Sequence, residues 1–384
     1  MSNKQYQHLK VTIAVRVTLL TNLVPPYRFA AYDALHHRAI SAGGGLRVLC
    51  TQHREPQRNW ATPKANFEQV TLPGVQIPLG ENRTFTLPFG VTRPLADQPT
   101  DALVLAGFGI AQWQAQNWAW KRGIPTVLQF DGWSGSDAAY ANPVRRRLRQ
   151  MMISRADGFI AAGTRGATWF ESHGIARENI SIAPIPPSFS VPEASTNRMQ
   201  YDLLWCGRTT RSKGFDVFIQ VAEALSKAGI VARVAIVGST NIAETIATLR
   251  ASGINDQADV FGQLPPDQLP AILTNSKIAL FPSRNDAYGV GVIDAISCGT
   301  VALASPMTGC APDILCRPEI LPTDVPNDWI KACEQLLGTP ALLETTRQNQ
   351  AKAIINNDPV HHGETIWNAI NQAAHRKSET RQWG

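Results

Sequence analysis

Short apolar segments alternate with segments of helical periodicity along most of the chain. In the first half, the apolar segments that predict strands are residues 15–22, 46–52, 101–107, 125–131 and 159–163. Helical patterns lie between them, at residues 28–45, 111–123 and 145–158. Strands that alternate with helices of this length predict parallel sheets with right-handed crossovers.

The alternation stops at residues 183–200 and then begins again. That segment is rich in Pro and Ser and has no periodicity, which is typical of a linker. Strands are predicted after it at residues 202–207, 232–239, 278–283 and 301–306, with 259–264 as a strand or a loop. Helices are predicted at residues 214–229, 240–253 and 266–276, from about residue 288, and after Pro359, where a basic tail follows the last helix.

Two alternating runs on either side of a linker predict an α/β protein with two doubly wound, Rossmann-like domains. The expected domains are residues 1–190 and 200–362, and residues 363–384 are expected to return toward the first domain as a helix. Ligands of such folds bind beyond the C-terminal ends of the strands. The cleft between the two domains is therefore the expected site.

The composition restricts the classes of partner. Of the 384 residues, 44% are hydrophobic and 17% are charged, so the chain has enough apolar residues for real cores and is not globally disordered. The net charge of +6 favours anionic partners. The basic residues are dispersed and no aromatic-basic motif appears, so nucleic acid is not an expected partner.

Cysteine usage and the start of the chain bear on the compartment. The six cysteines form no CxxC pair and no cluster with zinc spacing, which is typical of reduced thiols in the cytosol. The start is polar, and the apolar run after it is interrupted by Arg16, so no signal peptide is expected. No segment approaches the ~18 apolar residues that a membrane span needs. We therefore expect a cytoplasmic protein that is soluble or lies on a membrane surface.

The second predicted domain opens with a basic loop, "LLWCGRTTRSKG". Arg208 and Lys213 follow the strand that ends at Gly207, so they are expected at the cleft edge of the sheet. A guanidinium fork and an ammonium point charge can together hold a diphosphate. A solvated basic loop remains the alternative.

A second stretch, "RNDAYGVGVIDAISCGT", places two carboxylates around a helix start. Asp286 lies in the loop after a strand, and Asp294 follows eight positions later, about one turn into the helix. Free amides near Gly289 favour a phosphate, while a carboxylate at Asp294 can accept from the two hydroxyls of a ribose. Asp286 could accept from sugar hydroxyls. The alternative is that both acids cap the helix and oppose its dipole.

Four motifs together resemble the family 4 retaining glycosyltransferases of GT-B fold. They are "GRTTRSKG", the Gly of "VFGQL", "FPSRNDAYGVGVIDAISCGT" and "VALASPMTGCAPDI", in order and at the family's spacing across residues 200–316. The resemblance implies transfer of a hexose, with retention, from a nucleotide-diphosphate sugar such as a UDP- or GDP-hexose. The acceptor would be a glycan or a lipid-linked molecule, in surface polysaccharide or glycolipid synthesis. No further cofactor is implied.

The resemblance also assigns roles to the two motifs. Arg208 and Lys213 would bind the donor diphosphate, helped by the amides of Gly289 and Val290, and Tyr288 is counted among the donor-binding residues. Asp294 would bind the ribose, and Asp286 the transferred sugar.

Two features qualify this assignment. The family usually has Glu at both acidic positions, and each Asp here is one carbon shorter, so a weakly active relative that binds nucleotide sugars stays open. The chain holds no DxD triplet, which argues against the metal-dependent GT-A class, and no metal site is expected.

The first domain carries fewer signals. "LTNLVPPYRFAAYDAL" is similar to the "PYR" start of a subset of bacterial surface-polysaccharide glycosyltransferases. Tyr27 and Arg28 would then face the acceptor side of the cleft; packing of the Tyr and solvation of the Arg remain the alternative. Many family members have a His at the end of a first-domain strand, near the sugar. Here Asp131 ends the strand at 125–131 and is the candidate for that place.

A different enzyme class rests on residues 107–131. "GFGIAQ" follows a strand and opens a helix, and Asp131 lies 22 residues after Gly109. This approaches a dinucleotide fingerprint, with Gln112 in place of the third glycine, and it keeps an NAD-dependent oxidoreductase as the alternative function.

Residues 143–153, "PVRRRLRQMMI", predict a basic amphipathic helix. Val144, Leu148, Met151 and Met152 share one face, and arginines cover the others. Such a helix can lie on an anionic membrane, at the inner face where a lipid-linked acceptor is found. The alternative is an ordinary helix whose apolar face packs on the core.

Overall fold

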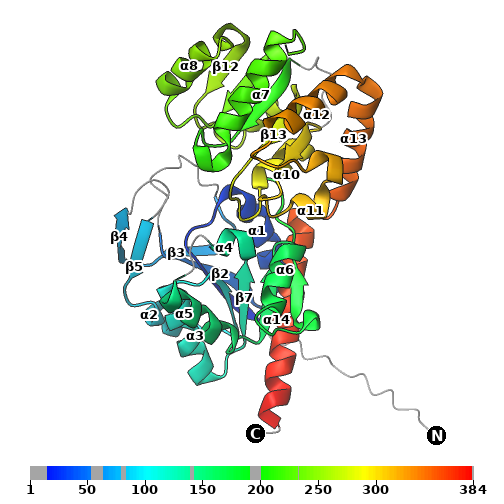
Figure 1. Cartoon of the computed structure of the whole chain (residues 1–384). Helices are drawn as coiled ribbons and strands as arrows, with labels where there is room; N and C mark the ends of the chain where they lie inside the picture. Colours follow the sequence, from blue (N-terminus) through cyan, green and yellow to red (C-terminus); the bar gives the residue numbers. More distant parts are fainter. Residues whose placement is uncertain are drawn as a thin grey trace, which may run out of the picture.

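The computed structural model describes residues 15–52, 64–78, 84–138, 142–190, 200–231 and 233–382. It contains two parallel sheets, one built from each half of the chain, and helices pack against both faces of each (Figure 1). The α/β fold class expected from the alternating pattern is therefore confirmed. In the first sheet, this packing buries nearly continuous apolar runs, because neither face of the sheet meets water.

The first sheet has seven strands in the order β3-β2-β1-β6-β7-β8-β9, all in parallel pairs. Its strands are β1 Arg16–Thr21, β2 Gly45–Cys50, β3 Glu68–Thr71, β6 Ala102–Ala106, β7 Thr126–Phe130, β8 Gly158–Ala161 and β9 Ile180–Ile182. A separate antiparallel hairpin joins β4 Gly74–Pro78 to β5 Thr84–Pro88. The hairpin, β3 and β9 were not predicted.

Helices cover the two faces of the first sheet with different side chains from the same strands. Val17 and Leu19 of β1 pack with α1 Pro26–Ser41 on one face, and Leu20 packs with α3 Ile110–Arg122 on the other. The remaining helices of this half are α2 Thr92–Asp97, α4 Ser134–Ala138, α5 Pro143–Ile153 and α6 Thr164–Glu171. This alternation along one strand is what fixes its register between two layers.

The second sheet has five strands in the order β12-β11-β10-β13-β14, again all parallel. They are β10 Tyr201–Cys206, β11 Val234–Val237, β12 Ala258–Phe261, β13 Ser276–Phe281 and β14 Val301–Ala304. The helices around it are α7 Phe215–Lys227, α8 Ile242–Ala251, α9 Leu269–Leu273, α10 Val290–Ser297, α11 Ala311–Ile314, α12 Pro326–Gly338 and α13 Pro340–Ala353.

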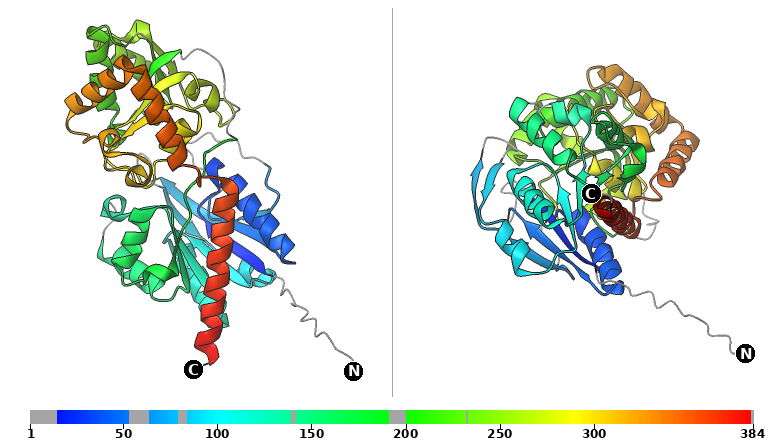
Figure 2. Two further views of the ribbon diagram at one scale, coloured as in Figure 1. Left: turned by 90° about the vertical axis from the view of Figure 1, so that its right-hand side faces the viewer. Right: turned by 90° about the horizontal axis from the view of Figure 1, so that it is seen from below.

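The last helix, α14, returns from the second half of the chain to the first. It spans Pro359–Gln382 and runs beside α1 along the first sheet (Figures 1 and 2). Ile366 and Ile370 are buried in the same core as Tyr32 and Leu35 of α1. The basic residues expected as a tail after this helix belong to the helix itself, which continues to Gln382.

Residues 183–190, the first part of the predicted linker, are packed rather than solvated. Ala183 and Ile185 are 0% and 1% exposed, and Ser188 contacts a side chain of the second half. Residues 191–199 of the predicted linker lie outside the described residues. The crossover between the two sheets therefore contributes side chains to the cleft itself.

Strand order explains where the cleft lies. In the second sheet, β10 lies between β11 and β13, so the connections after β10 and β13 leave in opposite directions. A crevice opens at such a switch point, beyond the C-terminal strand ends. The basic loop follows β10 and the acidic stretch follows β13, which brings these two predicted motifs together.

Candidate active site

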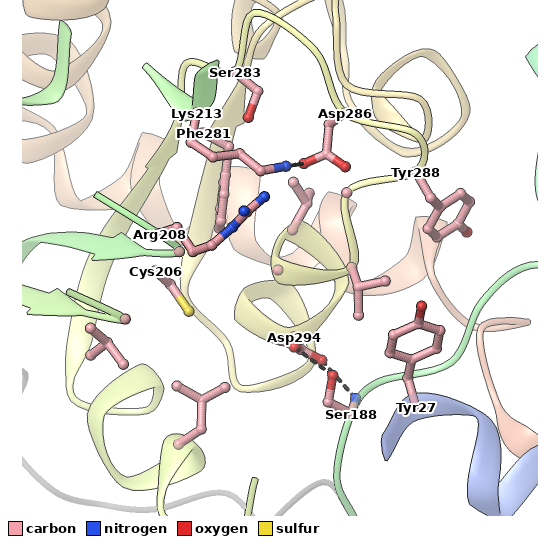
Figure 3. A pocket seen from close by; sticks show the side chains of 18 of the residues that line it. Tyr27, Ser188, Cys206, Arg208, Lys213, Phe281, Ser283, Asp286, Tyr288 and Asp294 are labelled. Carbon is pink, nitrogen blue, oxygen red and sulfur yellow. Dashed lines mark hydrogen bonds and ion pairs between the residues drawn. The ribbon is translucent and has the colours of Figure 1, made fainter. Parts of the chain in front are cut away.

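A cavity of about 460 Å³ lies between the two halves of the chain, at the switch point of the second sheet. Figure 3 shows its lining. The candidate catalytic and donor-binding residues all contribute to its wall, whereas Arg28 does not: Asp131, Arg208, Lys213, Asp286, Tyr288, Gly289, Val290 and Asp294. Pro26 and Tyr27 line it from the first half, and Ser188 from the crossover.

The basic loop is pressed against the loop that carries Asp286. Lys213 ends a short 3-10 helix, Arg211–Lys213, and Gly214 follows with φ +81°. A Cβ at Gly214 would lie 2.0 Å from the Pro282 carbonyl oxygen, so only glycine permits this approach. As a result the Lys213 ammonium reaches the Asp286 carboxylate, with Nζ 2.6 Å from Oδ2.

The acids do not cap the helix, which excludes one of the alternatives. Helix α10 begins after Gly289, which has φ +100° and no capping side chain. Asp286 pairs with Lys213 instead, and Asp294 is a buried residue inside the helix, 4% exposed. The uncapped first turn of α10 faces the cavity, an arrangement that suits an anion.

Asp294 is held by the crossover segment. Its Oδ1 accepts from the Ser188 amide at 2.7 Å, and its Oδ2 accepts from the Ser188 hydroxyl at 2.9 Å (Figure 3). Two donors on the two carboxylate oxygens form the same pattern that a ribose diol would offer. Burial raises the pKa of Asp294 to about 7, although both Ser188 hydrogen bonds act in the opposite direction.

This raised pKa predicts how stability changes with pH. An unfolded Asp releases its proton near pH 3.8, whereas folded Asp294 keeps it to about pH 7, so folding loses free energy as pH rises between these values. Asp294→Asn keeps an oxygen for the Ser188 amide, places an NH2 group that the Ser188 hydroxyl can accept from, and removes the titration. We expect the free energy of unfolding of the variant, relative to that of the wild type, to rise by roughly 2 kcal/mol between pH 5 and pH 7. Urea unfolding of both proteins across this range measures the difference; a constant difference contradicts the prediction.

Tyr288 ties the donor side of the cavity to the connections between the two halves. Its hydroxyl accepts from the Ile185 amide at 3.2 Å and from Asn357 Nδ2 at 3.0 Å. Asn357 also donates to the Ile185 carbonyl at 3.0 Å. The two chain connections between the halves, which carry Ile185 and Asn357, therefore meet at Tyr288, the residue before Gly289.

Arg28 and Asp131 form the wall on the side of the first sheet. The Arg28 side chain is 3% exposed, and its Nη2 lies 2.6 Å from Asp131 Oδ1, while the Asp131 side chain is 39% exposed and borders the cavity. The solvated Arg28 considered from sequence is therefore wrong. Burial disfavours the charge on Arg28, but the Asp131 carboxylate together with the nearby Tyr32 and Tyr27 hydroxyl groups outweighs burial, so the pKa of the guanidinium is raised.

Two further side chains complete the surroundings of Arg28. With its oxygen turned toward Arg28, the Gln129 amide accepts from both terminal nitrogens at 2.8 and 3.1 Å. His362 of α14 donates from Nδ1 to the Pro184 carbonyl, which leaves Nε2 to accept from Arg28. Burial lowers the pKa of His362 well below its usual value, so it is neutral here. The last helix is thereby joined to the acceptor side of the cleft.

The glycine turn at residues 107–112 leaves little room for a dinucleotide. Gln112 is 2% exposed, and its side chain folds back to donate to the Ala106 carbonyl at 3.2 Å. Its oxygen lies 2.4 Å from where a Cβ on Gly109 would be. The side chain therefore occupies the space that a pyrophosphate needs beside the second glycine.

The basic helix α5 buries only part of its apolar face. Met152 is 0% exposed and Leu148 packs on the core of the first half, but Val144 is 79% exposed beside a row of exposed arginines. Of the described helices, none is long and apolar enough to cross a bilayer. Within the described part of the chain, no three His, Cys, Asp or Glu side chains converge as metal ligands would.

Sequence reasoning missed the residues that connect the two halves at the cavity. Ser188 lies in a segment without periodicity, and His362 belongs to a helix far away in the sequence. Trp133 carried a usable signal, because it follows a strand end that already placed Asp131 in the cleft. The structure brings the predicted residues together, while their roles toward a ligand stay predictions.

Residues 191–353 match the family model of the glycosyl transferases group 1. Among solved structures, the fold resembles Anabaena Alr3699/HepE in complex with UDP, with a TM-score of 0.73 and 12% identity over 93% of this chain and all of that one. It also resembles the sucrose-phosphate synthase of Thermosynechococcus elongatus, with a TM-score of 0.66 and 15% identity over 96% of this chain and 99% of that one. The fold is therefore GT-B, as expected.

A curated relative from Mycobacterium tuberculosis is 25% identical over 264 residues, which are 62% of this chain and 65% of the relative. It is a GDP-mannose-dependent alpha-(1-6)-phosphatidylinositol dimannoside mannosyltransferase. The chain thus spans slightly less than two thirds of that relative's length.

Proposed function

We propose that this chain, which carries a group 1 glycosyl transferase domain in a GT-B fold, transfers a hexose from a nucleotide-diphosphate sugar to a hydroxyl acceptor. The single observation that carries the proposal is the order of groups along the cavity wall. Asp286, the uncapped start of α10 and Asp294 follow one another, with Arg208 and Lys213 facing them from the loop after β10. Sugar, diphosphate and ribose are arranged in this order in a nucleotide sugar.

The charges explain how the donor would be accepted. Without a donor, the Lys213 ammonium is balanced by the Asp286 carboxylate at 2.6 Å. A diphosphate carries more charge than one carboxylate, so it would draw Lys213 toward itself and leave Asp286 to accept from the sugar hydroxyls. The first turn of α10 adds amides that need a partner. Donor binding and the release of Asp286 are thus one event.

Transfer then requires little from the protein beyond this arrangement. The bond between the anomeric carbon and the diphosphate oxygen breaks, and its electron pair leaves with the phosphate. The acceptor oxygen forms its bond from the same face, and its proton passes to the leaving phosphate. Because the acceptor attacks the face from which the diphosphate leaves, the proposed reaction is retaining. Lys213, Arg208 and the α10 amides stabilise the charge that develops on the leaving group, so the proposed reaction needs no metal.

Asp131 is proposed to hold the acceptor hydroxyl. Arg28 occupies its Oδ1, and no hydrogen bond to its Oδ2 comes from the described residues. This carboxylate lies on the part of the cavity wall that the first half of the chain contributes, whereas the donor motifs belong to the second half. An acceptor hydroxyl bound there would face the transferred sugar.

A glycan or a lipid-linked molecule is the proposed acceptor, by analogy with the relative that acts on a phosphatidylinositol dimannoside. The exposed arginines and Val144 of α5 offer a surface for anionic lipid. We accordingly propose a cytoplasmic protein that reaches the inner face of the membrane through residues 143–153.

The proposal is tested by a panel of UDP-, GDP- and ADP-hexoses, with release of the nucleoside diphosphate as the readout. Turnover of one donor is the expected result. Binding without turnover would instead identify a nucleotide-sugar-binding relative, consistent with the two shorter acids. Binding of NAD with no response to any nucleotide sugar would contradict the proposal and favour an oxidoreductase.

Ser188 offers a sharper test of the ribose position. Because its amide and hydroxyl each donate to one oxygen of Asp294, a ribose that binds there competes with the Ser188 hydroxyl. Ser188→Ala removes that competitor and keeps the amide. We expect the variant to bind the preferred nucleoside diphosphate about three- to tenfold more tightly, and to show no gain with the 2′,3′-dideoxy analogue. Calorimetric titration measures both; weaker binding of the ribonucleotide would show that Ser188 instead supports the site.

A further inference from the structure

The loop that follows β7 reaches across the cleft to the loop that carries Asp286. Trp133 lies two residues after Asp131, and its indole Nε1 donates to the backbone carbonyl of Asp286 at 3.1 Å. The two residues are 153 positions apart in the chain and belong to the two different halves. This contact is therefore a direct hydrogen bond between the acceptor side and the donor side.

Trp133 is itself held firmly enough to position a partner. Its amide donates to the Ser136 hydroxyl at 2.9 Å, and that hydroxyl is also 2.9 Å from the Trp133 carbonyl. A Cβ at Gly135 would lie 2.2 Å from the indole ring, so only glycine leaves room for the ring there. The Arg165 guanidinium lies over the ring, 4.3 Å from its centroid.

Arg165 also holds the turn after β14, which lies next to Asp286. Its Nη1 donates to the Pro306 carbonyl at 2.5 Å, with the Thr308 carbonyl 3.4 Å away. Asp286 in turn donates its amide to the Met307 carbonyl at 3.0 Å and forms a β-bridge with Thr308. The backbone around Asp286 is thus fixed from both halves of the chain.

From this geometry we infer that Trp133 is a positioning residue, which fixes Asp286 relative to the acceptor side of the cleft. The inference rests on the proposed function, because it assigns to Trp133 the placement of the acid that would contact the transferred sugar. Since Trp133 and Asp131 share one loop, the indole hydrogen bond also sets the separation between the two carboxylates. Turnover therefore depends on the hydrogen bond from the Trp133 indole to the Asp286 carbonyl. The contacts to the diphosphate and the ribose do not depend on it.

Trp133→Phe tests the inference, because it removes the N–H group and keeps a ring for Arg165. We expect turnover of the preferred nucleotide sugar to fall about tenfold, while the Kd of its nucleoside diphosphate stays within twofold. Trp120→Phe, at an exposed tryptophan of the same half, is the control and should change neither quantity. Unchanged turnover in Trp133→Phe would overturn the inference, and so would an equal loss of nucleotide binding, which would indicate a general opening of the cleft.

Hydrogen exchange supplies a second readout that needs no substrate. In the full-length protein without nucleotide, the amide of Asp286 should exchange about fivefold faster in Trp133→Phe than in the wild type, at unchanged global stability. Arg165→Ala should act in the same direction on residues 306–308. If the wild type turns over no donor, the proposed function fails, and the exchange rates still decide the positioning role. Equal exchange rates of these amides in the wild type, Trp133→Phe and Arg165→Ala would overturn the positioning role of Trp133.

Discussion

Lys213→Ala is expected to reduce turnover of the nucleotide sugar by about 10²- to 10³-fold. Loss of a single group that stabilises a developing anion has an effect of this size in other enzymes. The ammonium pairs with Asp286 and lines the same cavity as the start of α10. Without the ammonium, only Arg208 and the amides of the first turn of α10 would stabilise the departing phosphate. The Kd of the nucleoside diphosphate should rise by about one to two orders of magnitude, because one charge-assisted hydrogen bond is lost.

Steady-state kinetics and calorimetric titration measure the two effects of Lys213→Ala. Lys227→Ala is a suitable control, because Lys227 is a surface lysine that pairs with Glu223 on helix α7, four residues earlier. That variant should behave like the wild type. Turnover by Lys213→Ala within threefold of the wild type would remove the basic loop from the proposed mechanism.

Asp131→Ala should destabilise the protein by about 3 kcal/mol, at the low end of the range for a broken buried pair. The cost arises because the variant leaves the buried Arg28 guanidinium without a counter-charge, beside the neutral Gln129, His362 and the Tyr27 ring. The low end applies because Asp131 itself is 39% exposed and partly screened by water. Urea unfolding measures the change, and turnover should fall as well if Asp131 holds the acceptor.

A second ion pair of helix α1, which is exposed, gives the control for Asp131→Ala. Glu364 of α14 pairs with Arg38 of α1, at side-chain exposures of 45% and 44%. Because water screens such pairs, Glu364→Ala should cost no more than about 1 kcal/mol. Equal costs for the two variants would mean that Arg28 does not depend on Asp131 for its burial.

The fold was predictable because its signal is local. The alternation of apolar strands and helical segments required only windows of a few residues, and it was read correctly for most of the two sheets. Site residues that directly follow a strand were found for the same reason. Arg208 follows β10 and Asp286 follows β13, and neighbouring parallel strands bring their C-terminal ends to one edge.

The contacts between the two halves were not predictable in this way. Ser188 lies in a segment with no period, and its bond to Asp294 depends on how the crossover passes the cleft. His362 reaches Arg28 only because α14 returns across 334 positions of sequence. The indole bond of Trp133 likewise exists only once the two sheets face each other. No pattern in a single stretch of sequence encodes such placements.

The most direct test of the central claim is a calorimetric titration of the full-length protein with UDP, GDP and ADP, in parallel with Lys213→Ala. One nucleoside diphosphate should bind the wild type with a Kd between about 1 µM and 1 mM, the usual range for substrates of enzymes. Lys213→Ala should bind the same ligand at least tenfold more weakly. If the wild type binds none of the three, or if Lys213→Ala binds as tightly as the wild type, the cavity is not a nucleotide-sugar site.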